Sequence, residues 1–331
     1  MTRAAVIGSG SWGTAFAATM AYAGTDVVMW ARRAELAAQI AQGRNTDYLP
    51  GIELPVLQAT TDFAQAVRGA DVVVFAVPSQ TLRAGLDQWA DLLPEDAAVV
   101  SLMKGVELGT TKRMSEVIAE VGRVESDRIV VVSGPNLARE IASRQPAASV
   151  VACSDELMAE RVAEACVTPW FRPYTNDDVV GVELGGALKN VVALAVGMAE
   201  GMGLGDNTKA SLITRGLAET ARLGAALGAS PTTLMGLAGV GDLIATCMSP
   251  LSRNHTFGVE LARGRTVEQV AAGLHQTAEG VKSCESILQL GHDHGVDLPI
   301  VGAVVAVVQG KVTPVEMVGE LMGRSLKSEA D

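Results

Sequence analysis

The 331-residue chain lacks the patterns that mark several classes of protein. Its four cysteines include no C-x-x-C pair, which argues against a disulfide framework and a zinc site and favours a reducing compartment. Its four histidines form no recognisable metal-binding motif, so we expect neither a bound metal nor metal catalysis.

Basic residues are in the minority, because 26 Lys and Arg stand against 37 Asp and Glu and give a formal charge of -11. Nucleic acids and anionic membranes bind basic surfaces, so we expect neither as a main partner. The most apolar later runs, 191–198 and 300–308, are shorter than the roughly 20 residues that span a bilayer. The N-terminal apolar run is broken by glycines, unlike a signal peptide. A cytoplasmic, soluble protein is therefore expected.

What the sequence does contain is an alternation of β-type and helical runs through its first half, and 331 residues favour two domains. The β-type runs are rich in Val and Ile, as strands covered on both faces are. They indicate an α/β, Rossmann-type, doubly wound parallel sheet in residues 1–176. Residues 177–331 show long helical periods and predict an all-helical domain for substrate binding and catalysis, with the site between the domains. The expected strands are 4–7, 26–30, 71–77, 97–102, 128–132 and 147–152, and the clearest helices are 179–202, 207–227 and 277–292.

A G-x-G-x-x-G turn at Gly8, Gly10 and Gly13 follows the first predicted strand and leads into an alanine-rich helix. Such a turn lets the backbone approach a pyrophosphate, which then lies on the helix N-terminus. The motif alone also fits a plain strand-to-helix turn, but a second β-type run at 26–30 completes the unit that a dinucleotide requires. We interpret the turn as a nicotinamide dinucleotide site.

The end of the second predicted strand lacks the Asp or Glu that usually binds the ribose 2′-hydroxyl of NAD. Arg32 and Arg33 stand there instead, and a guanidinium can bind a 2′-phosphate. The pattern favours NADP(H), or use of both NADP(H) and NAD(H). Two solvated arginines at a helix start are the alternative.

Lys189 is the strongest candidate for proton transfer, because it shares one predicted helix face with small and apolar residues. Burial would lower the pKa of its ammonium toward the range useful for a general acid or base. A lysine that reaches solvent or pairs with a buried carboxylate is the alternative. Asn190 beside it could orient a substrate. The residues on that face are Val182, Gly186, Ala193 and Val196.

Three further positions could complete a site. Lys104 directly follows a predicted strand and could polarise a carbonyl or bind an anion, unless it is a surface turn lysine. Asp242 could be a helix N-cap, which the sequence slightly favours, or could orient and charge-balance Lys189. The run Ser252-Arg253-Asn254 precedes a helical stretch and combines a hydroxyl, a guanidinium and an amide, which suits a phosphate.

Together these motifs resemble those of the bacterial-type NAD(P)-dependent sn-glycerol-3-phosphate dehydrogenases over essentially the whole chain. The resemblance implies a Rossmann-type domain, a helical domain, and reversible reduction of dihydroxyacetone phosphate to glycerol 3-phosphate for phospholipid synthesis, with a homodimer expected. Another two-domain reductase of a small acid and a non-catalytic nicotinamide sensor are the rival interpretations. The matching motifs are 8–14, Lys104-Gly105-Val106-Glu107, Ser133-Gly134-Pro135 with Ala138 and Glu140, Glu183-Leu184 through Lys189-Asn190, 239–242 and 252–254.

The resemblance also implies roles for single residues. Lys189 is similar to the family's proton donor and acceptor. The chain departs from the usual pattern at Asn136, where Ser or Thr is common, and at Thr277, where an apolar residue is common. Substrate contacts are implied for Lys104, Gly134, Asn136, Lys189, Asp242, Ser252, Arg253 and Asn254, with Asn190 and Thr246 assisting. Cofactor contacts are implied for Gly8, Gly10, Ser11, Trp12, Gly13, Arg32, Arg33, Lys104, Ala138, Arg253, Thr277 and Glu279, with Tyr48 as a weaker candidate.

Overall fold

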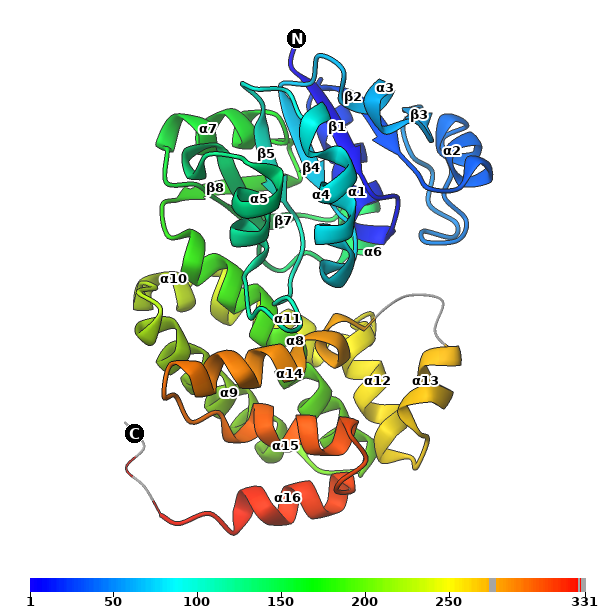
Figure 1. Cartoon of the computed structure of the whole chain (residues 1–331). Helices are drawn as coiled ribbons and strands as arrows, with labels where there is room; N and C mark the ends of the chain where they lie inside the picture. Colours follow the sequence, from blue (N-terminus) through cyan, green and yellow to red (C-terminus); the bar gives the residue numbers. More distant parts are fainter. Residues whose placement is uncertain (274–277, 327, 329–331) are drawn as a thin grey trace.

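A computed structural model of the chain describes residues 1–273, 278–326 and 328. Eight strands form one sheet in the order β3-β2-β1-β4-β5-β6-β7-β8. Figure 1 shows this sheet with its helices in one half of the molecule and the later helices in the other. The strands are β1 Arg3–Ile7, β2 Asp26–Trp30, β3 Gln58–Thr60, β4 Val72–Phe75, β5 Ala98–Ser101, β6 Ile129–Ser133, β7 Ala147–Ala152 and β8 Phe171–Asn176.

The sheet is covered on both faces, because alternate residues of one strand point to opposite sides. Ala4 and Val6 of β1 belong to one buried cluster, while Ala5 and Ile7 belong to another. The doubly wound α/β fold is thereby confirmed. The helices of this half are α1 Ser11–Tyr22, α2 Ala34–Ala41, α3 Phe63–Val67, α4 Leu82–Trp89, α5 Met114–Gly122, α6 Ala138–Ala142 and α7 Glu156–Glu164, with short 3₁₀ turns at η1 Ser79–Thr81, η2 Ala90–Leu92 and η3 Ser126–Arg128.

The sheet is parallel as expected except at one place, where β6 and β7 pair antiparallel. The connection between them holds only the five-residue helix α6, which packs on α1 instead of crossing the sheet. A parallel return needs a longer crossover.

Two strands at the ends of the sheet, β3 and β8, were not predicted from the sequence. The first has three residues and the second is polar and half exposed, so neither resembles a buried strand.

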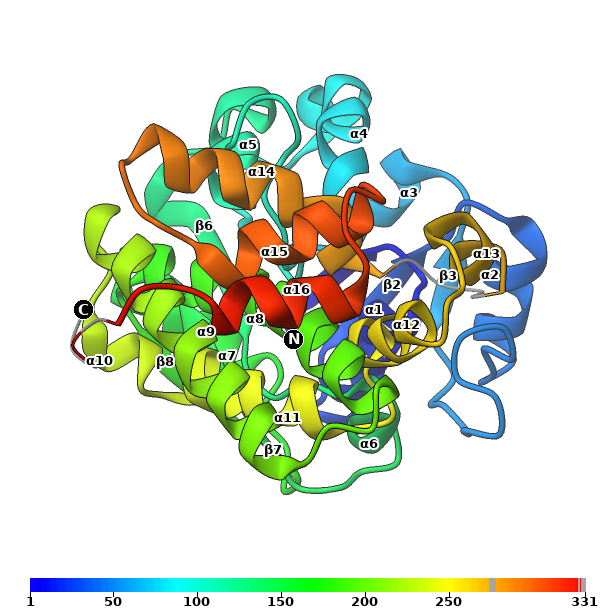
Figure 2. The same ribbon diagram turned by 90° about the horizontal axis from the view of Figure 1, so that it is seen from below.

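The second half is built around α8, in which 19 of the 23 residues are buried. Helix α12 packs closely on α8, because a Cβ at Gly197 would lie 2.1 Å from the carbonyl oxygen of His255. Figure 2 shows α8 near the centre of this half with α9, α12 and α15 around it. The helices are α8 Val179–Gly201, α9 Asp206–Ala226, α10 Pro231–Leu234, α11 Asp242–Met248, α12 Arg253–Ala262, α13 Val267–Gly273, α14 Glu279–Asp293, α15 Pro299–Val308 and α16 Pro314–Met322, with a π turn at η4 Leu237–Gly241.

Two segments are long and apolar enough to cross a membrane by length and composition, namely Val179–Gly201 and Pro231–Met248. The expectation compared only the runs 191–198 and 300–308 with a membrane span, and the first of these lies inside the longer apolar helix α8. In the apolar window of α8, 89% of the residues are buried inside the protein. This burial is what the central helix of a helical domain requires. The division into domains at residues 176 and 177 stays a prediction.

Candidate active site

The glycine turn between β1 and α1 has the geometry that its sequence predicts. Gly8 has a φ of +118°, and a Cβ there would lie 2.5 Å from the carbonyl oxygen of Ala76. A Cβ at Gly13 would lie 2.3 Å from the carbonyl oxygen of Gly8. At Gly10 an added Cβ would meet no described atom within 4 Å. The outer two glycines are therefore required by packing, whereas the middle one borders open space.

The start of α1 is open to an anion. Its N-cap is Gly10, so no side-chain oxygen caps the first N–H groups in the described structure. Next to it, the indole Nε1 of Trp12 is buried and has no hydrogen-bond partner among the described residues. A buried donor without a partner is costly unless a ligand accepts its proton. The residues of this turn thus fit a dinucleotide.

The remaining predicted cofactor residues surround this turn or lie on the helical half. Ser11 donates to the backbone oxygen of Tyr48 at 3.0 Å, and Ala138 packs in the same apolar cluster as Trp12. Glu279, the first residue of α14, accepts a hydrogen bond of 2.6 Å from Ser79, and burial raises the pKa of its carboxyl. Arg32 and Arg33 are exposed at the end of β2. Thr277 lies outside the described residues.

The centre of the candidate site is a buried carboxylate between two lysines. Asp242, at the start of α11, accepts hydrogen bonds of 2.6 Å from Lys104 on one oxygen and from Lys189 on the other. Lys189 also donates to Thr246 at 2.8 Å, and Lys104 donates to the backbone oxygen of Gly134 at 3.0 Å. Three segments far apart in the sequence therefore meet at one point between the two halves.

These contacts decide between the alternative interpretations of Asp242, Lys104 and Lys189. Asp242 does not cap α11, since Gly241 is the N-cap and the Asp242 side chain binds the two lysines instead. The slightly favoured N-cap interpretation is therefore wrong. Lys104 is not a surface turn lysine, because its side chain is mostly buried. Lys189 pairs with a buried carboxylate, which was the alternative to a role in proton transfer. An ion pair with Asp242 and a role in proton transfer are compatible in Lys189.

The environment of Lys189 destabilises its ammonium form relative to water. Its side chain is 9% exposed, and burial lowers the pKa of Lys189 from 10.5 to about 8. The negative charge of Asp242 opposes this shift, while the positive charge of Lys104 adds to it. A group with this pKa can both release and accept a proton near neutral pH.

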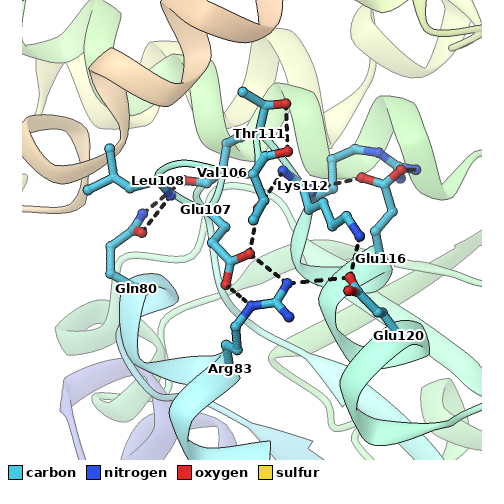
Figure 3. A network of polar contacts seen from close by, with 11 residues as sticks. Gln80, Arg83, Val106, Glu107, Leu108, Thr111, Lys112, Glu116 and Glu120 are labelled. Carbon is cyan, nitrogen blue, oxygen red and sulfur yellow. Dashed lines mark hydrogen bonds and ion pairs between the residues drawn. The ribbon is translucent and has the colours of Figure 1, made fainter.

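The loop that carries Lys104 is held by a network of polar side chains. Arg83 of α4 donates to both carboxylate oxygens of Glu107 at 2.9 Å and also reaches Glu120 of α5 (Figure 3). Gln80 donates to the Val106 backbone oxygen at 2.8 Å. Because Val106 and Glu107 follow Lys104 closely, this network restricts where the Lys104 backbone can lie. Arg83 was not predicted as a site residue, because an arginine on an amphipathic helix such as α4 carries no distinctive sequence pattern.

The side chains of Ser252 and Asn254, at the start of α12, form hydrogen bonds within the protein. Ser252 is the N-cap and accepts from the His255 backbone N–H at 3.3 Å. Asn254 donates to Asn190 and accepts from the Gly280 backbone N–H, each at 2.9 Å. Part of the Arg253 surface is exposed, while burial lowers the pKa of its guanidinium and the negative charge of Glu279 opposes that shift. A helix start with an exposed guanidinium beside it can bind a phosphate.

On the strand side, β6 ends next to the lysines. Gly134 has a φ of +144°, and an added Cβ would lie 3.1 Å from Ser149 Cα. Asn136 donates to Ser149 at 3.1 Å, but its own carbonyl oxygen is buried without a partner among the described residues. The hydroxyl of Ser133 is also buried and unpartnered there. Ser133 was not singled out as a site residue, although it is the last residue of a strand whose carboxyl end faces the site.

A second buried contact ties α8 to the sheet half. Glu183 accepts from the backbone N–H and hydroxyl of Ser115 and, at 2.8 Å, from Arg113. Burial raises the pKa of Glu183, and Arg113 opposes that shift. A cavity of about 540 Å³ lies beside this contact and is bordered by Arg113, Ser115 and Asp178. The lysine cluster does not line it.

The described residues contain no group of three or more His, Cys, Asp or Glu side chains that could hold a metal ion. The four cysteines are buried free thiols.

Comparison with known proteins assigns the chain to a family. The family model described as NAD-dependent glycerol-3-phosphate dehydrogenase N-terminus matches residues 3–159, and the corresponding C-terminus model matches residues 178–319. The chain is 64% identical over 329 residues to a Streptomyces coelicolor protein named glycerol-3-phosphate dehydrogenase [NAD(P)+], with 99% of this chain and 98% of the relative covered. A Thermobifida fusca protein of the same name is 60% identical, with 99% of each chain covered.

A solved structure agrees with these matches. The crystal structure of glycerol-3-phosphate dehydrogenase from Coxiella burnetii has a TM-score of 0.92 and 33% identity, and the match covers 98% of this chain and 99% of that one. The similarity therefore extends through both the sheet and the helical half. The chain belongs to the NAD-dependent glycerol-3-phosphate dehydrogenase family.

Proposed function

We propose that the protein reversibly reduces dihydroxyacetone phosphate to sn-glycerol 3-phosphate with NAD(P)H, and that Lys189 exchanges the proton. The observation that carries this proposal is the buried Lys104–Asp242–Lys189 cluster at the carboxyl ends of the strands, in a chain of this family. When bound at the glycine turn, the nicotinamide cofactor supplies or accepts the hydride. The residues of the chain provide the other requirements of the reaction.

In the reductive direction, Lys189 donates its proton to the C2 oxygen as negative charge develops there. Lys104 binds the other carboxylate oxygen of Asp242 and polarises the same carbonyl. Asp242 holds both ammonium groups in place, and Thr246 fixes the position of the Lys189 nitrogen. In the oxidative direction, neutral Lys189 removes the hydroxyl proton. Its pKa of about 8 leaves both forms accessible.

The substrate phosphate would bind at the start of α12, where Arg253 and the helix N-terminus attract an anion. Because the side chain of Asn254 is already bonded to Asn190 and Gly280, its contribution is to fix this helix start against α8. Phosphate binding there would position C2 at the lysine cluster. Gly134 and Asn136 complete the substrate side, and the unpartnered oxygen of Asn136 could accept a substrate hydroxyl.

The cofactor contacts follow the same reasoning. Gly10 and the start of α1 would hold the pyrophosphate, and the free Nε1 of Trp12 would donate to the cofactor. Arg32 and Arg33 would bind a 2′-phosphate and favour NADP(H), without excluding NAD(H). The proposal extends to a cytoplasmic homodimer that supplies glycerol 3-phosphate for phospholipid synthesis.

The test is the loss of reduced-nicotinamide absorbance when the protein meets dihydroxyacetone phosphate, with NADPH and NADH in parallel and unphosphorylated dihydroxyacetone as control. The variant Lys189→Ala should lose turnover and keep cofactor affinity. Lys311→Ala, at an exposed lysine far from the cluster in sequence, is the matched control. Full turnover in Lys189→Ala would exclude the proton-transfer role, and no oxidation with either cofactor would exclude the substrate.

A further inference from the structure

The exposed Arg33 at the end of β2 has a carboxylate partner from another segment. Its guanidinium lies 2.5 Å from a carboxylate oxygen of Asp47, in the loop between α2 and β3. This loop lies on the side of the sheet next to β3 (Figure 1). The two side chains are about half and two-fifths exposed, so the pair is in contact with water. An incoming anion could therefore compete for Arg33.

The position of Asp47 is fixed by its neighbours. Asn45 is buried and donates to the backbone oxygen of Ser9 at 3.0 Å and to the hydroxyl of Thr14 at 2.8 Å. On the other side of Asp47, the backbone oxygen of Tyr48 accepts the hydrogen bond from Ser11. The loop is thus bound to the glycine turn on both sides of Asp47. It brings a carboxylate to the end of β2, although β2 itself ends without one.

We propose that Asp47 is a specificity-determining residue that competes with the cofactor 2′-phosphate for Arg33. This inference rests on the proposed cofactor site. A 2′-phosphate can bind Arg33 fully only if the guanidinium leaves Asp47, so the affinity for a phosphorylated ribose is reduced by the strength of that pair. A ribose with a free 2′-hydroxyl does not need Arg33 and is not affected. The pair therefore reduces the preference for NADP(H) and keeps NAD(H) usable.

The size of the effect follows from the exposure of the pair. Exposed ion pairs contribute little, and losing one changes an equilibrium by about two- to fivefold. Removing the Asp47 charge should therefore tighten binding of a 2′-phosphorylated ligand by about two- to fivefold at low salt. Because exposed charges are screened, the gain should shrink as the ionic strength rises.

The experiment measures binding and not turnover. The dissociation constants of 2′-phospho-ADP-ribose and ADP-ribose are measured by calorimetry for the wild type, Asp47→Asn, Arg33→Gln and the double variant. Asp91→Asn is the matched control. Asp91, in η2, forms an equally short, exposed ion pair with Arg123 at the end of α5. Asp47→Asn should tighten only the phosphorylated ligand, and the control should change neither.

Each outcome has a definite meaning. An unchanged or lowered affinity for the phosphorylated ligand in Asp47→Asn would overturn the inference while leaving the cofactor site intact. If the gain persists in the double variant, Asp47 does not act through Arg33 and the competition is refuted. If the wild type binds neither ligand, the proposed cofactor site itself is wrong. A gain that is confined to the phosphorylated ligand and disappears without Arg33 supports the proposal.

Discussion

The lowered pKa of Lys189 makes a specific prediction about how each direction of the reaction depends on pH. A shift from 10.5 to about 8 means that burial and the neighbouring charges together disfavour the ammonium by about 3 kcal/mol relative to water. Oxidation of glycerol 3-phosphate needs the neutral amine, so its rate should rise as pH passes through about 8. The neutral fraction grows from about one-tenth at one unit below the pKa to about nine-tenths at one unit above it. Reduction needs the ammonium and should lose rate over the same interval.

The variant Asp242→Asn tests the cause of this shift. The Asp242 carboxylate raises the pKa of Lys189, whereas burial and Lys104 lower it. Removing the carboxylate leaves two neighbouring cations without their counterion, so the pKa of Lys189 should fall further. The rising limb of the oxidation profile should therefore move to lower pH, in addition to any loss of kcat.

The assay is the pH dependence of kcat for both directions at saturating cofactor, between about pH 6 and pH 10. Asp62→Asn is the control, because it makes the same chemical change at the exposed N-cap of α3. A limb that stays at the same pH in Asp242→Asn, or moves upward, would show that Lys189 is not the titrating group.

Three further predictions concern the turn, the Lys104 loop and a helix cap. Gly10→Ala should weaken cofactor binding and leave Tm unchanged, because the added Cβ enters open space. Gly8→Ala should lower the free energy of unfolding by about 1 to 3 kcal/mol, because the added Cβ clashes with the backbone and φ is positive. Thermal denaturation measures this loss. Arg83→Met should raise KM for dihydroxyacetone phosphate, because the Lys104 loop loses its anchor. The same variant should lower stability, because it leaves the buried Glu107 carboxylate unpaired, and adding Glu107→Gln should recover that loss. Glu219 accepts hydrogen bonds from the backbone N–H groups of Ile300 and Val301 at the start of α15. Burial raises the pKa of Glu219 to about 7, so its contribution to stability should fall as pH rises from 4.5 to 7. The variant Glu219→Gln should abolish that part of the pH dependence of Tm.

The buried strands and the glycine turn could be predicted because their signals are local. Residues 4–7 of β1 and the whole of β4 are continuous apolar runs, which burial on both faces requires. The glycines of the turn are set by contacts with the adjoining strand and helix. The edge strands β3 and β8 are not buried on both faces, so their sequences are not continuous apolar runs. The direction of β7 depends on how its connection to β6 packs, and hydrophobic periodicity carries no information about that packing.

The role of Asp242 could not be predicted in the same way. At the start of a helix, an Asp is usually explained by capping. Its actual partners, Lys104 and Lys189, lie 138 and 53 positions away in the sequence. The pairing of Asp47 with Arg33 was hidden for the same reason, since its loop had no regular pattern. Residue type and spacing identified the lysines, but only the fold shows which carboxylate lies between them.

When Lys189 is protonated, the lysine cluster carries one positive charge in excess, since two ammonium groups then share the single carboxylate of Asp242. Such an excess is unfavourable in a buried place, and a phosphorylated substrate would offset it. An anion nearby raises the pKa of an ammonium, so substrate binding should shift Lys189 toward its protonated form, which reduction requires. At pH 8, binding of dihydroxyacetone phosphate should then take up as much as about half a proton. Calorimetry in buffers of different ionisation enthalpy measures this uptake. Unphosphorylated dihydroxyacetone should show none, and equal uptake for both ligands would contradict the electrostatic argument.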